Sequence, residues 1–269
     1  MIKLADFIDI EDLKSIEHKE QLWLQSAFER FNGFPTLENL WKIMDEIWHK
    51  YNCDPKNLDS RVDNFYSHPI WLLSGLFIDQ HQISLVNRQI FAQWVSAKKP
   101  KRVADFGGGF GSLARMIAES NPETFVEVIE PHPHKLAIKK SKEFNNLSYK
   151  DNLEGKYDIL IATDVFEHVS DPLGLVAETS MFLNNEGFYL IANHFQPIIK
   201  CHLPQSYHLY HTFDYALEEM NFKIIEKISY GTVYKLIQKL SLDRARKIEK
   251  KSKRLWFFTK YLHRRIEAM

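Results

Sequence analysis

A run of glycines preceded by an acid is the segment of this sequence best suited to bind a ligand. The acid is Asp105, and the glycines that follow it occupy alternate positions, Gly107, Gly109 and Gly111. Glycines let a ligand approach the backbone closely and allow the positive φ angles of tight turns. The N–H groups at the start of the helix expected next add the positive end of a dipole. The segment therefore predicts a ligand site at the end of a strand.

The spacing of these glycines separates two kinds of ligand. A dinucleotide site requires G-x-G-x-x-G, so that a pyrophosphate rests on the helix N-terminus. Here the glycines alternate and Asp105 precedes them. A carboxylate at this place suits a ligand with a cationic ammonium group better than one with phosphates. A nucleoside with a cationic group is therefore favoured over a nicotinamide dinucleotide.

Acidic residues recur at the ends of later apolar runs. Glu130 follows the run after the glycines, where an acid can accept hydrogen bonds from both hydroxyls of a ribose. Asp151 and Asn152 come next along the chain, and Asp164 ends the following apolar run. Glu130 and Asp164 share one pattern, because each stands where a strand is expected to end.

The glycine segment and these acids together resemble the class I S-adenosylmethionine-dependent methyltransferases. Residues 103–111 are similar to motif I of that family, and residues 157–172 resemble small-molecule methyltransferases of the ubiquinone-biosynthesis-like group. The resemblance implies a Rossmann-like α/β fold with a seven-stranded mixed sheet. It also implies S-adenosylmethionine as cofactor and S-adenosylhomocysteine as product.

The resemblance assigns roles to individual residues. Asp105 would hold the methionine ammonium, Glu130 would bind the ribose, and Asp151 would lie near the adenine. Asp164 would lie beside the methyl group, although an acid there is equally suited to cap a helix. In full, the residues expected to bind the cofactor are Asp105, Gly107, Gly109, Glu130, Asp151, Asn152, Asp164 and His81.

Histidines are the candidates for a catalytic base. Methyl transfer depends mainly on alignment, and a base is needed only where the acceptor carries a proton. Histidine titrates in the range that such a base requires. His194 follows the expected fifth strand, His168 follows the fourth, and His208 lies in an insert-like loop after His194. Cys201 and the histidines of that loop match no standard zinc spacing, so no metal site is predicted.

A parallel sheet covered by helices would place all of these residues at strand ends. Between residues 102 and 240, apolar runs alternate with stretches of helical spacing, and the last two runs read as an antiparallel hairpin. The predicted division is a helical N-terminal extension over 1–98, a cofactor-binding domain over 99–240 and a basic helix over 241–269. The runs expected as strands are 102–106, 125–129, 157–163, 187–193, 222–228 and 232–237, and the helices between them are 112–120, 133–144 and 172–183.

Composition narrows the class of protein. The 35 basic and 35 acidic residues cancel, which argues against nucleic acid as the main partner. Two cysteines cannot form a disulfide framework, and acids within the first twenty residues are unlike a secretory signal. The apolar stretch 70–78 is too short to span a bilayer. A cytoplasmic location is expected, and the oligomeric state is not predicted.

The segment 235–269 carries an excess of basic residues with aromatic residues between them. Three roles are consistent with this pattern. It could form an amphipathic helix packed on the domain, touch an anionic membrane surface, or bind a partner or nucleic acid. The first role is favoured.

The sequence thus predicts transfer of a methyl group from S-adenosylmethionine to a small molecule or a sugar. Oxygen is the favoured acceptor atom. The alternatives are N-methylation, methylation of a larger polymer, and an inactive S-adenosylmethionine-binding regulator.

Overall fold

Most of the described residues before residue 99 are helical, as the apolar spacing predicts. The computed structural model describes residues 4–31 and 33–266. Thr36 and Asn39 exchange side-chain and backbone hydrogen bonds and so begin one helix, and Lys99, with φ of 49°, ends another before Pro100. These elements are η1 (Leu4–Asp6), α1 (Ile10–Leu13), α2 (His18–Glu29), α3 (Leu37–Lys50), α4 (Ser60–Tyr66), α5 (Pro69–Ile78) and α6 (Gln82–Lys98).

Helix α5 is the most apolar helix of this region and packs against the glycine loop. It begins with Pro69 at its first turn and buries residues on almost every side, so it serves as a core helix. Gly75 lies against Phe110, because a Cβ on Gly75 would stand 2.4 Å from the Phe110 Cβ. The helix therefore supports the loop through a contact that only glycine permits.

Replacing Gly75 by alanine is expected to destabilise the protein by about 1–3 kcal/mol, because the added methyl group collides with Phe110. In an exposed helix the same change would stabilise by about 1 kcal/mol. The measurement is urea unfolding, with the Ser74→Ala variant of the same helix as control. Equal or greater stability of Gly75→Ala would contradict the contact.

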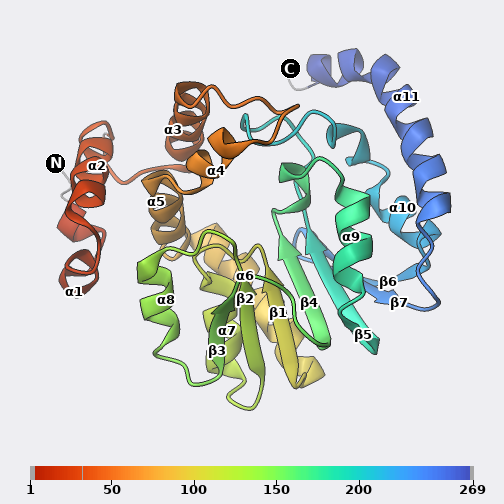
Figure 1. The fold of residues 1–269 in the computed structure, drawn as a ribbon, viewed down its shortest axis with the longest axis horizontal. Coiled ribbons are helices and arrows are strands. Elements are labelled where there is room, and N and C mark those ends of the chain that lie inside the picture. Colours follow the sequence, from red (N-terminus) through yellow and green to blue (C-terminus); the bar gives the residue numbers. More distant parts are fainter. Residues whose placement is uncertain (1–3, 32, 267–269) are drawn as a thin grey trace. The chain divides into compact units, whose positions relative to one another are not determined.

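Strands of the described residues form a seven-stranded mixed sheet in the order β3-β2-β1-β4-β5-β7-β6 (Figure 1). Strand β2 is parallel to β1 and β3, and β4 is parallel to β5, whereas β7 is antiparallel to β5 and β6. The strands are β1 (Arg102–Phe106), β2 (Phe125–Ile129), β3 (Leu147–Lys150), β4 (Tyr157–Thr163), β5 (Leu183–Ala192), β6 (Phe222–Ile228) and β7 (Gly231–Leu236). The predicted fold class, a Rossmann-like α/β fold with such a sheet, is confirmed.

Four strands, β1, β2, β4 and β6, have the predicted bounds. Their apolar runs are nearly continuous in β1, β2 and β4, which is typical of strands buried on both faces. Strand β3 was not predicted as a strand, because its four residues include only one fully buried side chain, Leu147. The expected start of the strand over 187–193 is also wrong, since β5 begins at Leu183 and pairs there with Tyr157.

The chain forms two compact units, which are described separately. One contains Met1–Leu153 with Ile198–Cys201, and the other contains Glu154–Pro197 with His202–Met269. The three-part division expected from sequence follows local pattern and stays a prediction. The remaining helical elements are α7 (Ser112–Ser120) and α8 (Lys135–Ser141) in the first unit, and η2 (Phe166–His168), α9 (Pro172–Ser180), η3 (Tyr207–Leu209), α10 (Phe213–Glu219) and α11 (Leu242–Ile266) in the second.

The basic segment folds as helix α11, which packs on α9 and α10 (Figure 1). Ser252 of α11 is buried and donates a hydrogen bond to the His208 carbonyl at 2.5 Å. Arg246 pairs with both carboxylate oxygens of Asp171, at 2.7 and 2.5 Å. These contacts are those expected of a helix packed on its domain. Residues 267–269, the end of the predicted basic helix, lie outside the described residues.

Replacing Ser252 by alanine is expected to lower the free energy of unfolding by about 1–3 kcal/mol, because its partners are buried. It leaves the His208 Nδ1, 3.1 Å away, without its hydrogen bond. Chemical denaturation measures the loss, and Lys251→Ala, at an exposed neighbouring position, is the control. Equal stability of the two variants would show that the hydrogen bonds of Ser252 contribute nothing to the free energy of unfolding.

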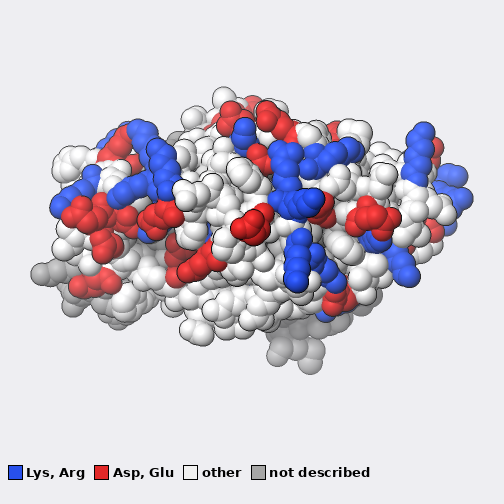
Figure 2. All heavy atoms as spheres, turned by 90° about the horizontal axis from the view of Figure 1, so that it is seen from below, with Lys and Arg blue, Asp and Glu red and all other residues white. Residues whose placement is uncertain are grey.

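The visible face of the protein carries charges of both signs. On the face shown in Figure 2, acidic and basic side chains are interspersed, and neither sign covers the face alone. Among the described helices, none combines the length and the apolar character that crossing a membrane requires.

Candidate functional site

The glycine loop after β1 has the backbone conformation that its sequence predicts. Gly107, Gly109 and Gly111 have φ angles of 68°, 53° and 73°, which favour glycine strongly. The N–H of Gly111 donates to the Gly108 carbonyl at 2.9 Å, and helix α7 begins directly afterwards. The loop therefore turns the chain directly from strand into helix.

Asp105 lies beneath this loop and is almost completely buried, with 1% of its surface exposed. A Cβ on Gly108 would stand 2.6 Å from Asp105 Oδ2, so Gly108 is the glycine that the carboxyl group requires. Sequence reasoning did not single out Gly108, because only the folded loop brings it over Asp105. Among the described residues, Asp105 Oδ1 has no hydrogen-bond partner.

Burial raises the pKa of the Asp105 carboxyl to about 7, although the positive charge of Arg88 opposes the rise. A buried acid without a full set of partners is costly, and a cationic ligand group would remove that cost. A side chain on Gly109 would meet open space, since no heavy atom of the described residues beyond its two chain neighbours lies within 4 Å of its Cβ position. Both observations fit a ligand that lies on the loop and offers a cationic nitrogen.

Glu130 lies beside the same loop, at the end of β2. Its Oε2 accepts a hydrogen bond from the Gly109 N–H at 3.1 Å, and its Oε1 accepts one from the His132 N–H at 3.0 Å. The structure thus brings together Glu130 and the glycines, two parts of the predicted cofactor set. Their contact with a cofactor stays a prediction.

Tyr149 of β3 is a further residue of this site that sequence reasoning did not assign. Its hydroxyl donates to the Gly109 carbonyl at 3.1 Å, and a Cβ on Gly111 would stand 2.5 Å from it. Burial raises the pKa of the Tyr149 hydroxyl, so it remains a hydrogen-bond donor. Asp151 and Asn152 follow β3 directly and are exposed, so their predicted place near an adenine is neither confirmed nor contradicted.

His81 precedes α6, and its ring stacks on Phe77 with centroids 4.8 Å apart. Its Nδ1 lies 2.9 Å from Ser84 Oγ, so the ring is held at the start of its own helix. Nearby, Arg115 joins the loop to α5, donating to the Phe110 carbonyl at 2.6 Å and pairing with Asp79. The predicted cofactor contact of His81 stays a prediction.

A second group of polar residues lies at the carboxyl ends of β4 and β5, which are parallel neighbours. Asp164 follows β4 with φ of 55°, and its Oδ1 accepts from His194 Nδ1 at 3.2 Å. Its Oδ2 accepts from the Tyr230 hydroxyl at 3.0 Å, in the turn between β6 and β7. The hydrogen bond to Asp164 raises the pKa of His194, although burial opposes it. This Asp–His pair can accept and deliver a proton.

Glu167 holds the backbone of this group. It is fully buried, and its Oε1 accepts from the His194 N–H at 2.8 Å. Burial and the charge of Asp164 raise the pKa of the Glu167 carboxyl to about 8. Glu167 is assigned no role from the sequence, since nothing in the sequence shows that it meets His194.

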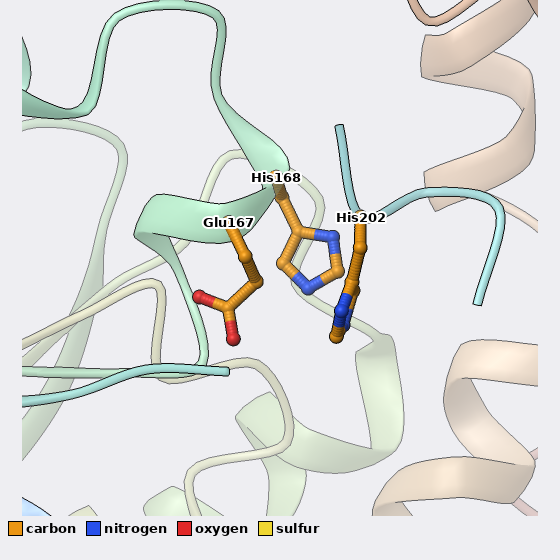
Figure 3. Close-up of side chains that lie close together, drawn as sticks. All are labelled: Glu167, His168 and His202. Atoms are coloured by element: carbon orange, nitrogen blue, oxygen red, sulfur yellow. The ribbon is translucent and has the colours of Figure 1, made fainter. Parts of the chain in front are cut away.

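The other two predicted catalytic histidines have different surroundings. The ring of His168 meets that of His202 edge to face, with centroids 4.9 Å apart (Figure 3). His208 is buried against α11, where its Nδ1 lies 3.1 Å from Ser252 Oγ and burial lowers its pKa to about 4. His208 therefore has the contacts of a packing residue, whereas His194 is paired with Asp164, a predicted site acid.

Comparison with known proteins identifies relatives of the chain. The sequence model of a family described as a methyltransferase domain matches residues 80–230. A search of curated proteins finds no match.

Solved structures share the fold at low sequence identity. The carbon methyltransferase of CurJ is 13% identical, covers 80% of this chain and 69% of its own, and has a TM-score of 0.53. Human N-acetylserotonin methyltransferase, solved with S-adenosylmethionine, is 12% identical, with coverages of 75% and 67% and a TM-score of 0.50. A protein of Nostoc punctiforme named as a candidate O-methyltransferase is 14% identical, with coverages of 62% and 59% and a TM-score of 0.45. The chain thus spans less than two thirds of that last protein.

Proposed function

Because this chain belongs to the methyltransferase domain family, we propose that it is an enzyme that transfers a methyl group from S-adenosylmethionine. The observation that carries the proposal is the buried Asp105 beneath the glycine loop, with one carboxyl oxygen lacking a partner among the described residues. S-adenosylmethionine supplies a methyl group on a positively charged sulfur, and its amino acid end carries an ammonium group.

Three features of this chain would hold that molecule. Asp105 would accept a hydrogen bond from the ammonium group, which also relieves the cost of its burial. The open space at Gly109 would let the molecule lie on the backbone. Glu130, already bonded to the Gly109 N–H, would receive the ribose hydroxyls.

The acceptor is proposed to be a small molecule or a sugar that is methylated at oxygen. His194 supports an oxygen acceptor, because a hydroxyl must lose its proton during transfer. The Asp164 carboxylate can only accept a hydrogen bond, so Nδ1 of a neutral His194 carries the proton and Nε2 keeps a lone pair. Nε2 would take the proton of the acceptor, and the resulting imidazolium would be stabilised by Asp164.

Tyr230 and Glu167 would position this base. The Tyr230 hydroxyl holds the second oxygen of Asp164, and its ring lies 5.3 Å from the His194 ring. Glu167 holds the His194 backbone N–H. With both contacts in place the imidazole is oriented before the acceptor arrives, which lowers the cost of reaching the transition state.

Calorimetry with S-adenosylmethionine and S-adenosylhomocysteine tests the donor site. One molecule of each is expected to bind per chain, and absence of heat with both would reject the proposal. Transfer of a tritiated methyl group from the donor to panels of hydroxylated molecules, sugars, amines and polymers tests the acceptor. Label on amines or polymers alone would favour those alternative acceptors, and binding without any transfer would favour a regulator.

A location in the cytoplasm and a contact of α11 with an anionic membrane surface also remain proposals. The contacts of Ser252 and Arg246 hold one face of α11 on its own domain, and its exposed residues include Lys247, Lys250 and Arg254. A basic exposed face supports binding to anionic lipid. Sedimentation with anionic and neutral vesicles separates such a contact from simple packing.

A further inference from the structure

The second carboxyl oxygen of Glu167 is a buried group that the proposed reaction does not use. Oε1 receives the His194 N–H, whereas Oε2 is buried and has no partner among the described residues. The side chain as a whole has no exposed surface. An unsatisfied carboxyl oxygen in such a place is costly unless it binds a cation or a proton.

Two imidazole rings lie beside this carboxyl group. His168 follows Glu167 in the η2 turn, and His202 comes from the loop between β5 and α10 (Figure 3). One ligand atom from each of these side chains lies within 4.8 Å of the ligand atoms of the other two. Figure 3 shows the carboxyl group and the two rings grouped side by side, although they come from separate segments.

The hydrogen bond of His202 determines which of its nitrogens can bind a metal. Its Nδ1 lies 2.7 Å from the carbonyl oxygen of Gln196. A carbonyl oxygen can only accept, so in the neutral ring Nδ1 carries the proton and Nε2 has the lone pair. Metal-binding histidines commonly have this arrangement, in which a backbone carbonyl orients the ring.

We propose that Glu167, His168 and His202 form a binding site for one divalent ion of the zinc type. Two imidazoles and one carboxylate are a donor set that zinc accepts, whereas magnesium and calcium prefer oxygen ligands throughout. Bonds to zinc of about 2.0–2.2 Å in a tetrahedral arrangement place ligand atoms about 3.3–3.6 Å apart. Small rotations of the three side chains would reach that spacing, and a fourth position would remain for water or another ligand.

The neighbouring group of Asp164, Glu167 and His194 is a weaker candidate for the same ion. Its ligand atoms are also close together, but Asp164 and His194 already bond to each other, and both are exposed. Both groups contain the buried, unsatisfied oxygen of Glu167, and the two-histidine group adds the His202 ring that a carbonyl holds. The spacing of Cys201 and the histidines of its loop does not reveal this group, because Glu167 and His168 come from another segment.

Metal binding by the full chain, purified without a histidine tag and stripped with a chelator, tests the inference. Titration with Zn²⁺ against a chromophoric chelator is expected to give one ion per chain. Co²⁺ in the same protein is expected to show the visible absorption bands of a four-coordinate site. His202→Ala and Glu167→Gln are each expected to lose one-to-one binding, whereas His211→Ala, at an exposed position of the same loop, should keep it.

This experiment tests the metal site independently of the proposed methyl transfer, because it measures the amount of ion bound per chain. If stripped wild-type chain takes up no Zn²⁺, or if His202→Ala and Glu167→Gln bind as wild type does, the site is rejected. Circular dichroism and the melting temperature show whether each variant is folded. If the variants at the buried positions do not fold, His168→Ala, at a partly exposed position, replaces them in the test. Normal Zn²⁺ binding by His168→Ala would reject the site.

Discussion

Replacing His194 by alanine is expected to lower the rate of methyl transfer to a hydroxyl acceptor by about 10²–10⁴-fold, the range that loss of a general base produces. The affinity for S-adenosylmethionine should stay close to that of the wild type, because the groups proposed to hold the donor are Asp105, the glycine loop and Glu130. The measurements are single-turnover transfer of a labelled methyl group and calorimetry with the donor.

Variants around His194 distinguish a base from a packing residue. Asp164→Asn should also slow transfer, since an asparagine neither stabilises the imidazolium nor fixes which nitrogen carries the proton. Tyr230→Phe removes the hydrogen bond to Asp164 and should have a smaller effect. His211→Ala is the control. Wild-type rates in His194→Ala with a confirmed hydroxyl acceptor would remove His194 from the mechanism.

Replacing Asp105 by asparagine is expected to weaken binding of S-adenosylmethionine about 10–100-fold, because a charged hydrogen bond contributes about 1.5–3 kcal/mol. The same substitution should leave the stability of the folded protein unchanged or increase it. Burial raises the pKa of Asp105 above its value in an unfolded chain, so its charge costs stability at pH 8. The asparagine variant should therefore unfold at an equal or higher temperature than the wild type. Calorimetry and thermal unfolding measure both effects.

The affinity for S-adenosylmethionine should also depend on pH in a direction that Asp105 determines. Its pKa of about 7 means that half of the free protein carries a neutral carboxyl group at that pH. Since the ammonium group binds the charged form, affinity should fall below pH 7 and approach a slope of about tenfold per pH unit. The expected loss of affinity below pH 7 does not come from unfolding, because protonation of Asp105 stabilises the folded state as pH falls.

Calorimetry between pH 7.5 and 5.5 gives this profile. Asp105→Asn serves as the control and should have a flatter profile. The same slope in the variant and the wild type would assign the titration to another group. A flat profile in both would contradict the proposed ion pair.

Much of the fold could be predicted from the sequence because local pattern decides it. The bounds of β1, β2, β4 and β6 follow from apolar runs, and the positive φ angles of the loop follow from its glycines. β3 could not be predicted in this way, since a strand of four residues is held by pairing with β2 rather than by its own pattern. The start of β5 was also placed wrongly, because polar residues in 184–186 resemble a turn.

The amino-acid sequence by itself determined that an acid and a glycine turn stand at the end of the first strand, because residue type and spacing are sufficient for that local geometry. Only the tertiary structure decided that, of the candidate bases, His194 meets the Asp164 carboxylate and His208 is buried. His194 meets Asp164 because two parallel strands end together, and His208 packs on Ser252 because α11 returns to the domain. Such contacts join residues far apart in the chain, and their energies depend on burial, which no local spacing encodes.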